Sequence, residues 1–181
     1  DKLVTGVQTC ALPIYFCVGK TSLIRKFVFN LFDDKYLTTI GVSITKKQFS
    51  PIYKKKAFEV TLLIWDINGD NGYSKITPQY LMGASAAILV ADVTRQETMD
   101  NLAGHINSYL NKNPQGKILI ALNKCDLIEN EKTQEYFRQV HSHFDQKICD
   151  VFITSAKTGT NVENMFECIT QRILENGNYE L

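Results

Sequence analysis

The stretch KILIALNKCDL at residues 117–127 joins a strand pattern to a polar loop, and it decides the fold class. Its first part is almost continuously apolar, which is typical of a strand buried on both faces of a parallel sheet. Residues 87–90, AILV, have the same character. Parallel strands need long crossover connections, which are usually helices. The stretch therefore predicts an α/β domain.

Strand and helix patterns alternate on both sides of this stretch. A first helix follows Thr21, with apolar residues at helical spacing as far as Leu31, and Thr94 with Glu97 fits a capping box that opens another. The remaining patterns predict strands at 42–49, 58–65, 86–93 and 151–154, and helices at 97–110, 133–144 and 162–174. We expect one doubly wound domain with a mostly parallel sheet, one antiparallel edge hairpin and helices on both faces.

The composition bounds the class of protein. The chain has 181 residues, 44% of them hydrophobic and 22% charged, as in an ordinary globular domain. A net charge of +1 gives no electrostatic case for a nucleic-acid partner. The five cysteines have no metal or redox spacing, which fits a reducing compartment. We expect a cytoplasmic monomer without a visible lipid anchor, membrane-associated only if a lipidated C-terminus has been lost.

CVGKT at residues 17–21 has the chemistry of a phosphate-binding loop. Successive backbone N–H groups can surround a phosphate, and the following helix adds its positive dipole end. The residues that could supply these groups are Cys17, Val18 and Gly19. Lys20 can add a charge beside the β- and γ-phosphates, and the Thr21 hydroxyl can bind Mg²⁺. Because so short a motif occurs often by chance, it is weak evidence by itself, and the interpretation depends on the other segments.

Two further segments could complete a magnesium site. TIG at residues 39–41 places Thr39 where a loop hydroxyl can join the Mg²⁺ shell, and WDING at 65–69 ends a strand with Asp66. A carboxylate at a strand end can hold the ion through water. A turn or helix cap is the alternative interpretation of Asp66. The sequence predicts Thr21, Thr39 and Asp66 as the metal-binding residues.

The segment NKCD at residues 123–126 favours guanine as the base. The Asp126 carboxylate can accept two N–H bonds from guanine and none from the matching edge of adenine, so the wrong base leaves buried polar groups unpaired. Asn123 belongs to the same loop, and the stem of Lys124 can lie along the base. A later strand ends in a segment that could offer a backbone N–H to the guanine carbonyl oxygen, and it contains Ser155, Ala156 and Lys157.

These five segments, in this order, resemble a small GTPase of the Ras superfamily from residue 16 to about 174. VGKTSL at 18–23, TIGV at 39–42, Trp65 before Asp66 and NKCDL at 123–127 are most similar to Rab-type members. The resemblance implies a Mg²⁺-dependent switch between GTP and GDP forms. It also implies effector, exchange-factor and GTPase-activating proteins that bind the loops near Thr39 and Gly69. An ATP-using P-loop kinase is disfavoured by residues 123–126.

The resemblance places Gly69 beside the terminal phosphate and Asp70 at the catalytic position, where the family usually has a glutamine that orients water. An ionised carboxylate there cannot donate a hydrogen bond and is repelled by the γ-phosphate. We therefore expect slow intrinsic hydrolysis, with a hydrolysis-poor GTP-binding scaffold as the alternative function. The segment between Thr39 and Asp66 is also longer than usual in the family, which predicts an enlarged hairpin around residues 50–57.

Residues 1–14 differ in origin from the rest of the chain. VTGVQTCALPI at 4–14 matches, codon for codon, the translation of a common sequencing-library adapter, so we interpret 1–14 as an adapter-derived scar and 15–181 as the GTPase domain. The alternative is a genuine but unusual N-terminal strand. Ile14 stands where the phosphate loop needs its first glycine, and β-branching opposes positive φ. We expect a disrupted first strand and weakened nucleotide binding.

Overall fold

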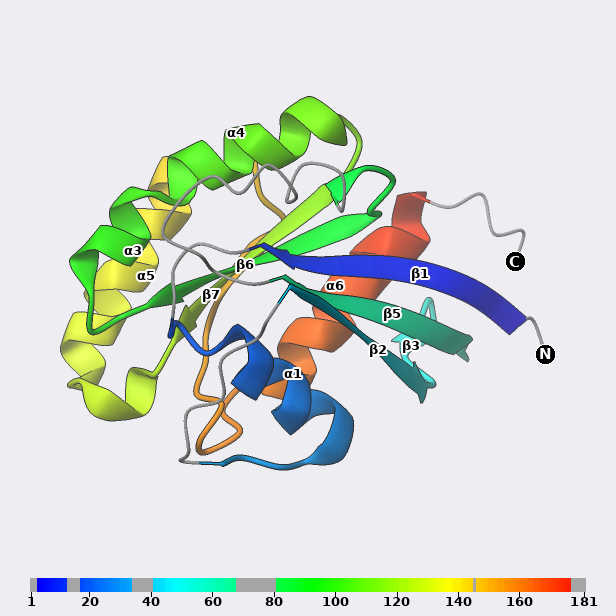
Figure 1. The fold of residues 1–181 in the computed structure, drawn as a ribbon, viewed down its shortest axis with the longest axis horizontal. Helices are drawn as coiled ribbons and strands as arrows, with labels where there is room; N and C mark the ends of the chain where they lie inside the picture. The colour runs from blue at the N-terminus through cyan, green and yellow to red at the C-terminus, as the bar shows by residue number, and fades with distance from the viewer. Residues whose placement is uncertain (1–2, 13–16, 34–40, 68–80, 145, 177–181) are drawn as a thin grey trace.

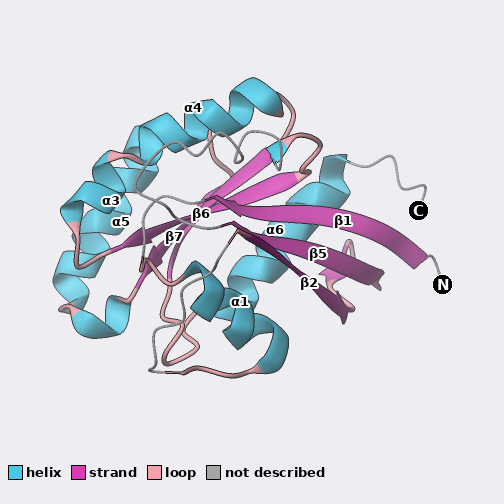
Figure 2. Ribbon diagram, in the orientation of Figure 1, coloured by secondary structure: helices cyan, strands magenta, loops and turns pink. Residues whose placement is uncertain are grey.

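The computed structural model describes residues 3–12, 17–33, 41–67, 81–144 and 146–176. Its centre is a six-stranded sheet in the order β2, β5, β1, β6, β7, β8 (Figures 1 and 2). The strands are β1 (Leu3–Leu12), β2 (Val42–Phe49), β5 (Glu59–Ile67), β6 (Ala86–Asp92), β7 (Lys117–Asn123) and β8 (Asp150–Ile153). All neighbours are parallel except β2, which runs antiparallel to β5 at one edge. The predicted α/β class is confirmed.

The burial of each strand follows its place in the sheet. Every residue of β6 is buried, and so is β7 after Lys117, because helices cover both faces there. In β5 the buried residues alternate with half-buried ones along most of the strand. The edge strand β2 has only exposed and half-buried residues. The continuously apolar runs in the sequence therefore mark the middle of the sheet.

Helices cover the two faces of the sheet in two groups. On one face, α1 (Lys20–Phe29) and α6 (Val162–Asn176) pack together, and Phe27 stacks on Phe166 with ring centroids 4.0 Å apart. The other face carries α3 (Gln96–Asp100), α4 (Leu102–Lys112) and α5 (Asn130–Phe144). Figure 1 shows this division. The two hydrophobic cores hold the sheet rigid, so its strand ends can position polar side chains.

Three local predictions need correction. The first helix ends at Phe29 rather than Leu31, because Asn30 adopts a left-handed φ of 53° that stops the helix. The helix expected at 97–110 is two helices that meet at Asn101. Thr94 does not cap α3; its hydroxyl donates instead to the Asp92 carboxylate at 2.6 Å. The N-cap position of α3 is occupied by Arg95, and the Thr94 N–H also donates to the same charged carboxylate, at 3.0 Å.

The structure also corrects the expectation of a disrupted first strand. Strand β1 lies between β5 and β6, in a register that pairs Thr9 with both Ile64 and Ala86. Strand pairing uses backbone N–H and C=O groups, which every residue except proline supplies. The irregularity between β1 and β5 is one register shift, between Val4 and Val7. The residues of the suspected scar thus form a strand in this structure.

A short two-stranded hairpin, separate from the main sheet, lies in the segment where an enlarged hairpin was predicted. It consists of β3 (Ile52–Tyr53) and β4 (Lys56–Ala57), joined by two lysines at positive φ, Lys54 at 48° and Lys55 at 63°. The Gln171 side chain of α6 donates to the Ile52 carbonyl oxygen at 3.0 Å and ties the hairpin to the domain. Among the described residues, no helix has the length and apolar character that crossing a membrane requires.

Candidate functional site

The predicted segments meet at one edge of the sheet. Asp66 in β5, Asp92 in β6 and Asn123 in β7 lie at or next to the carboxyl ends of parallel strands, and Thr154 follows the end of β8. The amino end of α1 also lies at this edge, because Thr21 contacts Asp66. In doubly wound folds this edge is where ligands bind. The structure therefore brings together the described parts of the predicted site.

The end of the phosphate loop depends on two residues with positive φ. Gly19, which precedes α1, has a φ of 94°, and Cys17 has a φ of 67°. Glycine adopts this region freely, whereas cysteine does so at a cost. Val18 between them is fully buried. The left-handed conformation of Cys17 was not predicted, because the sequence pattern there gave no turn residue to indicate it.

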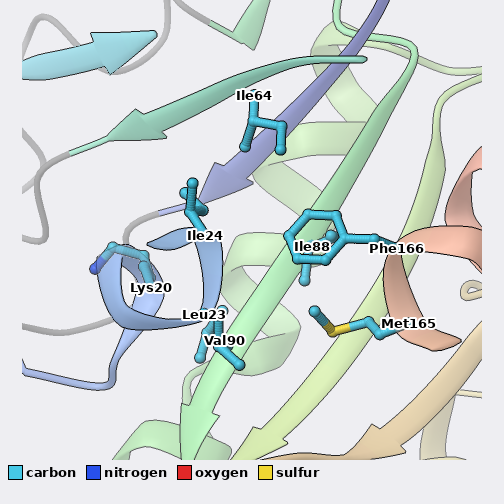
Figure 3. Close-up of a pocket in the computed structure, with 8 residues that line it drawn as sticks. All are labelled: Lys20, Leu23, Ile24, Ile64, Ile88, Val90, Met165 and Phe166. Atoms are coloured by element: carbon cyan, nitrogen blue, oxygen red, sulfur yellow. The ribbon is translucent and has the colours of Figure 1, made fainter. Parts of the chain in front are cut away.

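Lys20 begins α1 above an apolar cavity. The other side chains that line this cavity come from α1, β5, β6 and α6, and they are Leu23, Ile24, Ile64, Ile88, Val90, Met165 and Phe166. In Figure 3 the amine nitrogen of Lys20 points away from these apolar groups. Burial of the amine lowers its pKa to about 8, although the nearby Asp66 carboxylate opposes this change. A phosphate anion at the amino end of α1 would favour the charged amine.

Thr21 and Asp66 fit a magnesium site. The Thr21 hydroxyl donates to a carboxylate oxygen of Asp66 at 2.6 Å, so two of the three predicted oxygen ligands are adjacent. Asp66 is only 3% exposed. Mg²⁺ is a hard cation that prefers oxygen ligands, and this donor set supplies them beside the expected phosphates. The third predicted ligand, Thr39, lies outside the described residues.

The Asn123 side chain joins three segments of the chain. Its amide nitrogen donates to the Val18 carbonyl oxygen at 2.9 Å. Its amide oxygen accepts from the Thr154 hydroxyl at 3.3 Å and from the Ala156 N–H at 3.2 Å. Asn123 is 1% exposed, so each of these bonds is made away from water. Ala156 belongs to the segment predicted to offer a backbone N–H to guanine, and in this structure its N–H holds Asn123.

Asp126 is exposed at the same edge, where a base could reach it. The Ser155 hydroxyl, itself buried, donates to one Asp126 carboxylate oxygen at 2.5 Å. Ser155 was predicted as a guanine-binding residue; in this structure its side chain orients Asp126, and its contact with the base stays a prediction. Lys124 adopts a positive φ of 68°. Lys157, the remaining residue predicted to bind guanine, is exposed in the segment that follows β8.

Asp92 was missed by the sequence analysis. It ends β6, is 1% exposed, and its carboxylate lies 2.6 Å from the Lys124 amine. A signal for it was present in the sequence, because a carboxylate at the end of a continuously apolar strand needs a partner when it is buried. The predicted catalytic residues Gly69 and Asp70 lie outside the described residues.

Replacing Gly19 with alanine should destabilise the protein. A Cβ at this position would lie 2.3 Å from the Asn123 amide nitrogen, so the bond from Asn123 to Val18 would break. The free energy of unfolding should fall by about 1–2 kcal/mol because alanine disfavours the positive φ. It should fall by roughly 1–3 kcal/mol more because a buried hydrogen bond is lost. Denaturant unfolding measures the sum.

The matched control is Gly83→Ala. Gly83 has a similar φ of 79°, but a Cβ there would meet no atom within 4 Å. This variant should lose only the conformational part of the free energy. Equal losses for Gly19→Ala and Gly83→Ala would contradict the assigned role of Asn123.

Comparison with known proteins identifies the family of the chain. Residues 15–175 match the model of the Ras family. The chain is 34% identical over 158 residues to Ras-related protein Rab-22A of Homo sapiens, covering 86% of this chain and 78% of that protein. It is 34% identical over 174 residues to GTP-binding protein ypt5 of Schizosaccharomyces pombe, covering 95% and 80%. It is 30% identical over 167 residues to Ras-related protein Rab-31 of Mus musculus, covering 89% and 83%. The chain therefore belongs to the Ras family and is a Rab-like small GTPase.

Proposed function

We propose that this protein is a Rab-like switch that binds GTP and GDP with Mg²⁺, hydrolyses GTP and regulates vesicle traffic. The observation that carries this proposal is the arrangement after β7, where Ser155 holds an exposed Asp126 beside the buried Asn123. A related protein, ypt5, is named as GTP-binding. The Rab-type relatives favour a working switch over the hydrolysis-poor scaffold.

Recognition of guanine follows from the geometry of Asp126. The bond from Ser155 uses one carboxylate oxygen and restricts the rotation of the group, while the exposure of Asp126 leaves acceptor capacity for two N–H groups of a base. A fixed acceptor loses little conformational entropy when it binds. Adenine would leave the ionised carboxylate without donors, so discrimination against ATP should be strong.

The amino end of α1 would hold the phosphates. The N–H groups that precede α1 and the Lys20 amine supply positive charge. Mg²⁺, held by Thr21 and Asp66 with Thr39, would neutralise phosphate charge. Gly69 is proposed to contact the terminal phosphate. The segments around Thr39 and Gly69 would then differ between the GTP and GDP forms, and effectors, exchange factors and GTPase-activating proteins would bind there.

The first test changes the guanine acceptor with Asp126→Asn. The parent should bind GTP at least about tenfold more tightly than inosine triphosphate, which lacks the 2-amino group, because a hydrogen bond to a charged acceptor contributes about 1.5–3 kcal/mol. The variant should lose this preference, since its amide cannot accept two N–H bonds in the same way. Competition against a fluorescent GDP analogue measures both affinities.

The matched control is Glu129→Gln, a loss of one exposed carboxylate close in sequence. It should keep the parent preference for GTP. Including ATP in the competition tests the kinase alternative. A parent protein that binds ATP as tightly as GTP would contradict the proposed function.

The lowered pKa of Lys20 predicts proton uptake on nucleotide binding. In the free protein its pKa is about 8, so above that pH the amine is mostly neutral and must gain a proton to pair with phosphate. Affinity for GDP should therefore fall as the pH rises through about 8. Calorimetry at about pH 8.5 in two buffers with different ionisation heats should give different binding enthalpies. Identical enthalpies in both buffers would exclude this coupling.

Asp70 is proposed to slow intrinsic hydrolysis. Replacing it with glutamine removes the charge that opposes the γ-phosphate and adds an N–H donor for the attacking water. Asp70→Gln should hydrolyse GTP faster, by about tenfold or more if one transition-state hydrogen bond is gained. Single-turnover hydrolysis of preloaded GTP gives the rate. Equal rates in the parent and the variant would disprove the effect.

A further inference from the structure

Asp92 is a buried carboxylate with an unusual number of donors. One of its oxygens accepts from the Thr94 N–H at 3.0 Å and from the Thr94 hydroxyl at 2.6 Å. The other lies 2.6 Å from the Lys124 amine and 3.5 Å from Nε of Arg95. An ionised group that is 1% exposed requires such compensation. These contacts keep Asp92 anionic and fixed in orientation.

The charge state of Asp92 agrees with this geometry. Burial by itself raises the pKa of its carboxyl, but the hydrogen bonds from Lys124 and Thr94 outweigh that effect and leave the pKa below its ordinary value. The carboxylate is therefore charged at neutral pH, and it presents a permanent anion to Lys124.

The backbone of Asp92 is held as firmly as its side chain. The Asp92 N–H donates to the hydroxyl of Thr98 at 2.9 Å, and that hydroxyl donates to the Arg95 carbonyl oxygen at 2.8 Å. Thr98 is fully buried in α3. Since β6 is also paired on both sides, the position of Asp92 is determined by the sheet and by α3 together.

Lys124 connects this anchor to the proposed guanine site. In the chain it follows Asn123, whose side chain is bonded to the phosphate loop, and it directly precedes the short 3-10 helix Cys125–Leu127 that contains Asp126. A free lysine side chain has many rotamers, but a bond from its amine to a fixed carboxylate restricts the four-carbon stem. A stem restricted before the base arrives loses less entropy on binding.

We propose that Asp92 is a positioning residue for guanine binding, which acts by holding the amine of Lys124 so that its stem lies ready beside the base. This inference rests on the proposed function, because a role for Lys124 beside the base requires that the protein binds guanine nucleotides. Asp92 itself need not touch the nucleotide.

The main variant is Asp92→Asn, which preserves the shape of the side chain and replaces the anion. GDP should bind about tenfold more weakly, or weaker still, because one strong charged hydrogen bond to Lys124 is lost. The control is Asp100→Asn on α3, whose carboxylate is exposed and bonds only a neighbouring glutamine side chain among the contacts described. Its GDP affinity should stay within about twofold of the parent.

A second readout follows Lys124 directly. Brief acylation of nucleotide-free protein, mapped by mass spectrometry, should modify Lys124 more slowly than the exposed Lys157 in the parent. In Asp92→Asn the two lysines should react at similar rates. A loss of GDP affinity without a change at Lys124, or a change at Lys124 without a loss of affinity, would overturn the proposal.

Two further outcomes are distinguishable. If Asp92→Asn does not fold, Asp92→Glu keeps the anion but displaces it by one methylene, and affinity and Lys124 reactivity must again change together. A parent that does not bind GDP contradicts the proposed function. A parent that binds GDP while the Asp92 variants bind it equally well contradicts only the role of Asp92.

Discussion

The site depends on the hydrogen bonds of one buried amide, that of Asn123. Its nitrogen binds the Val18 carbonyl oxygen and its oxygen binds Thr154 and Ala156, so it fixes the phosphate loop relative to the segment after β8. Val18 and Asn123 are 105 residues apart in the chain. A buried network of this kind is stable only when every member is satisfied. The absence of a side chain on Gly19 is part of the same arrangement, because a Cβ would displace the amide.

The sheet makes this network possible. Parallel pairing places the carboxyl ends of β5, β6 and β7 at the same edge of the sheet, with β6 beside β7 and β1 between β5 and β6. A polar residue lies at or next to each of these ends: Asp66, Asp92 and Asn123. Both faces are covered by helices, so the strands cannot shift without disturbing two close-packed cores. The packed strands therefore fix the positions of the polar side chains at their ends.

The charges at the site are arranged in opposite ways at its two ends. At the proposed phosphate end, burial lowers the pKa of the Lys20 amine, and a bound anion would stabilise its charged form. Near the proposed base site, the Asp92 carboxylate and the Lys124 amine neutralise each other at 2.6 Å. The first arrangement favours binding of a highly charged ligand. The second fixes a side chain without adding net charge beside the base.

The sequence by itself determined the α/β class, the doubly wound arrangement and the segments of the site, because apolar strands buried on both faces and polar strand ends are local patterns. It did not determine that Ser155 and Ala156 hold Asp126 and Asn123, since those partners are about thirty residues apart. The left-handed φ of Cys17 and the central strand from residues 3–12 also required the tertiary structure. Local propensity disfavoured both, and tertiary context can override propensity, as the pairing of β1 with β5 and β6 shows for the strand. Asp92 became interpretable for the same reason: a carboxylate acquires its role from the amine that folding brings to it.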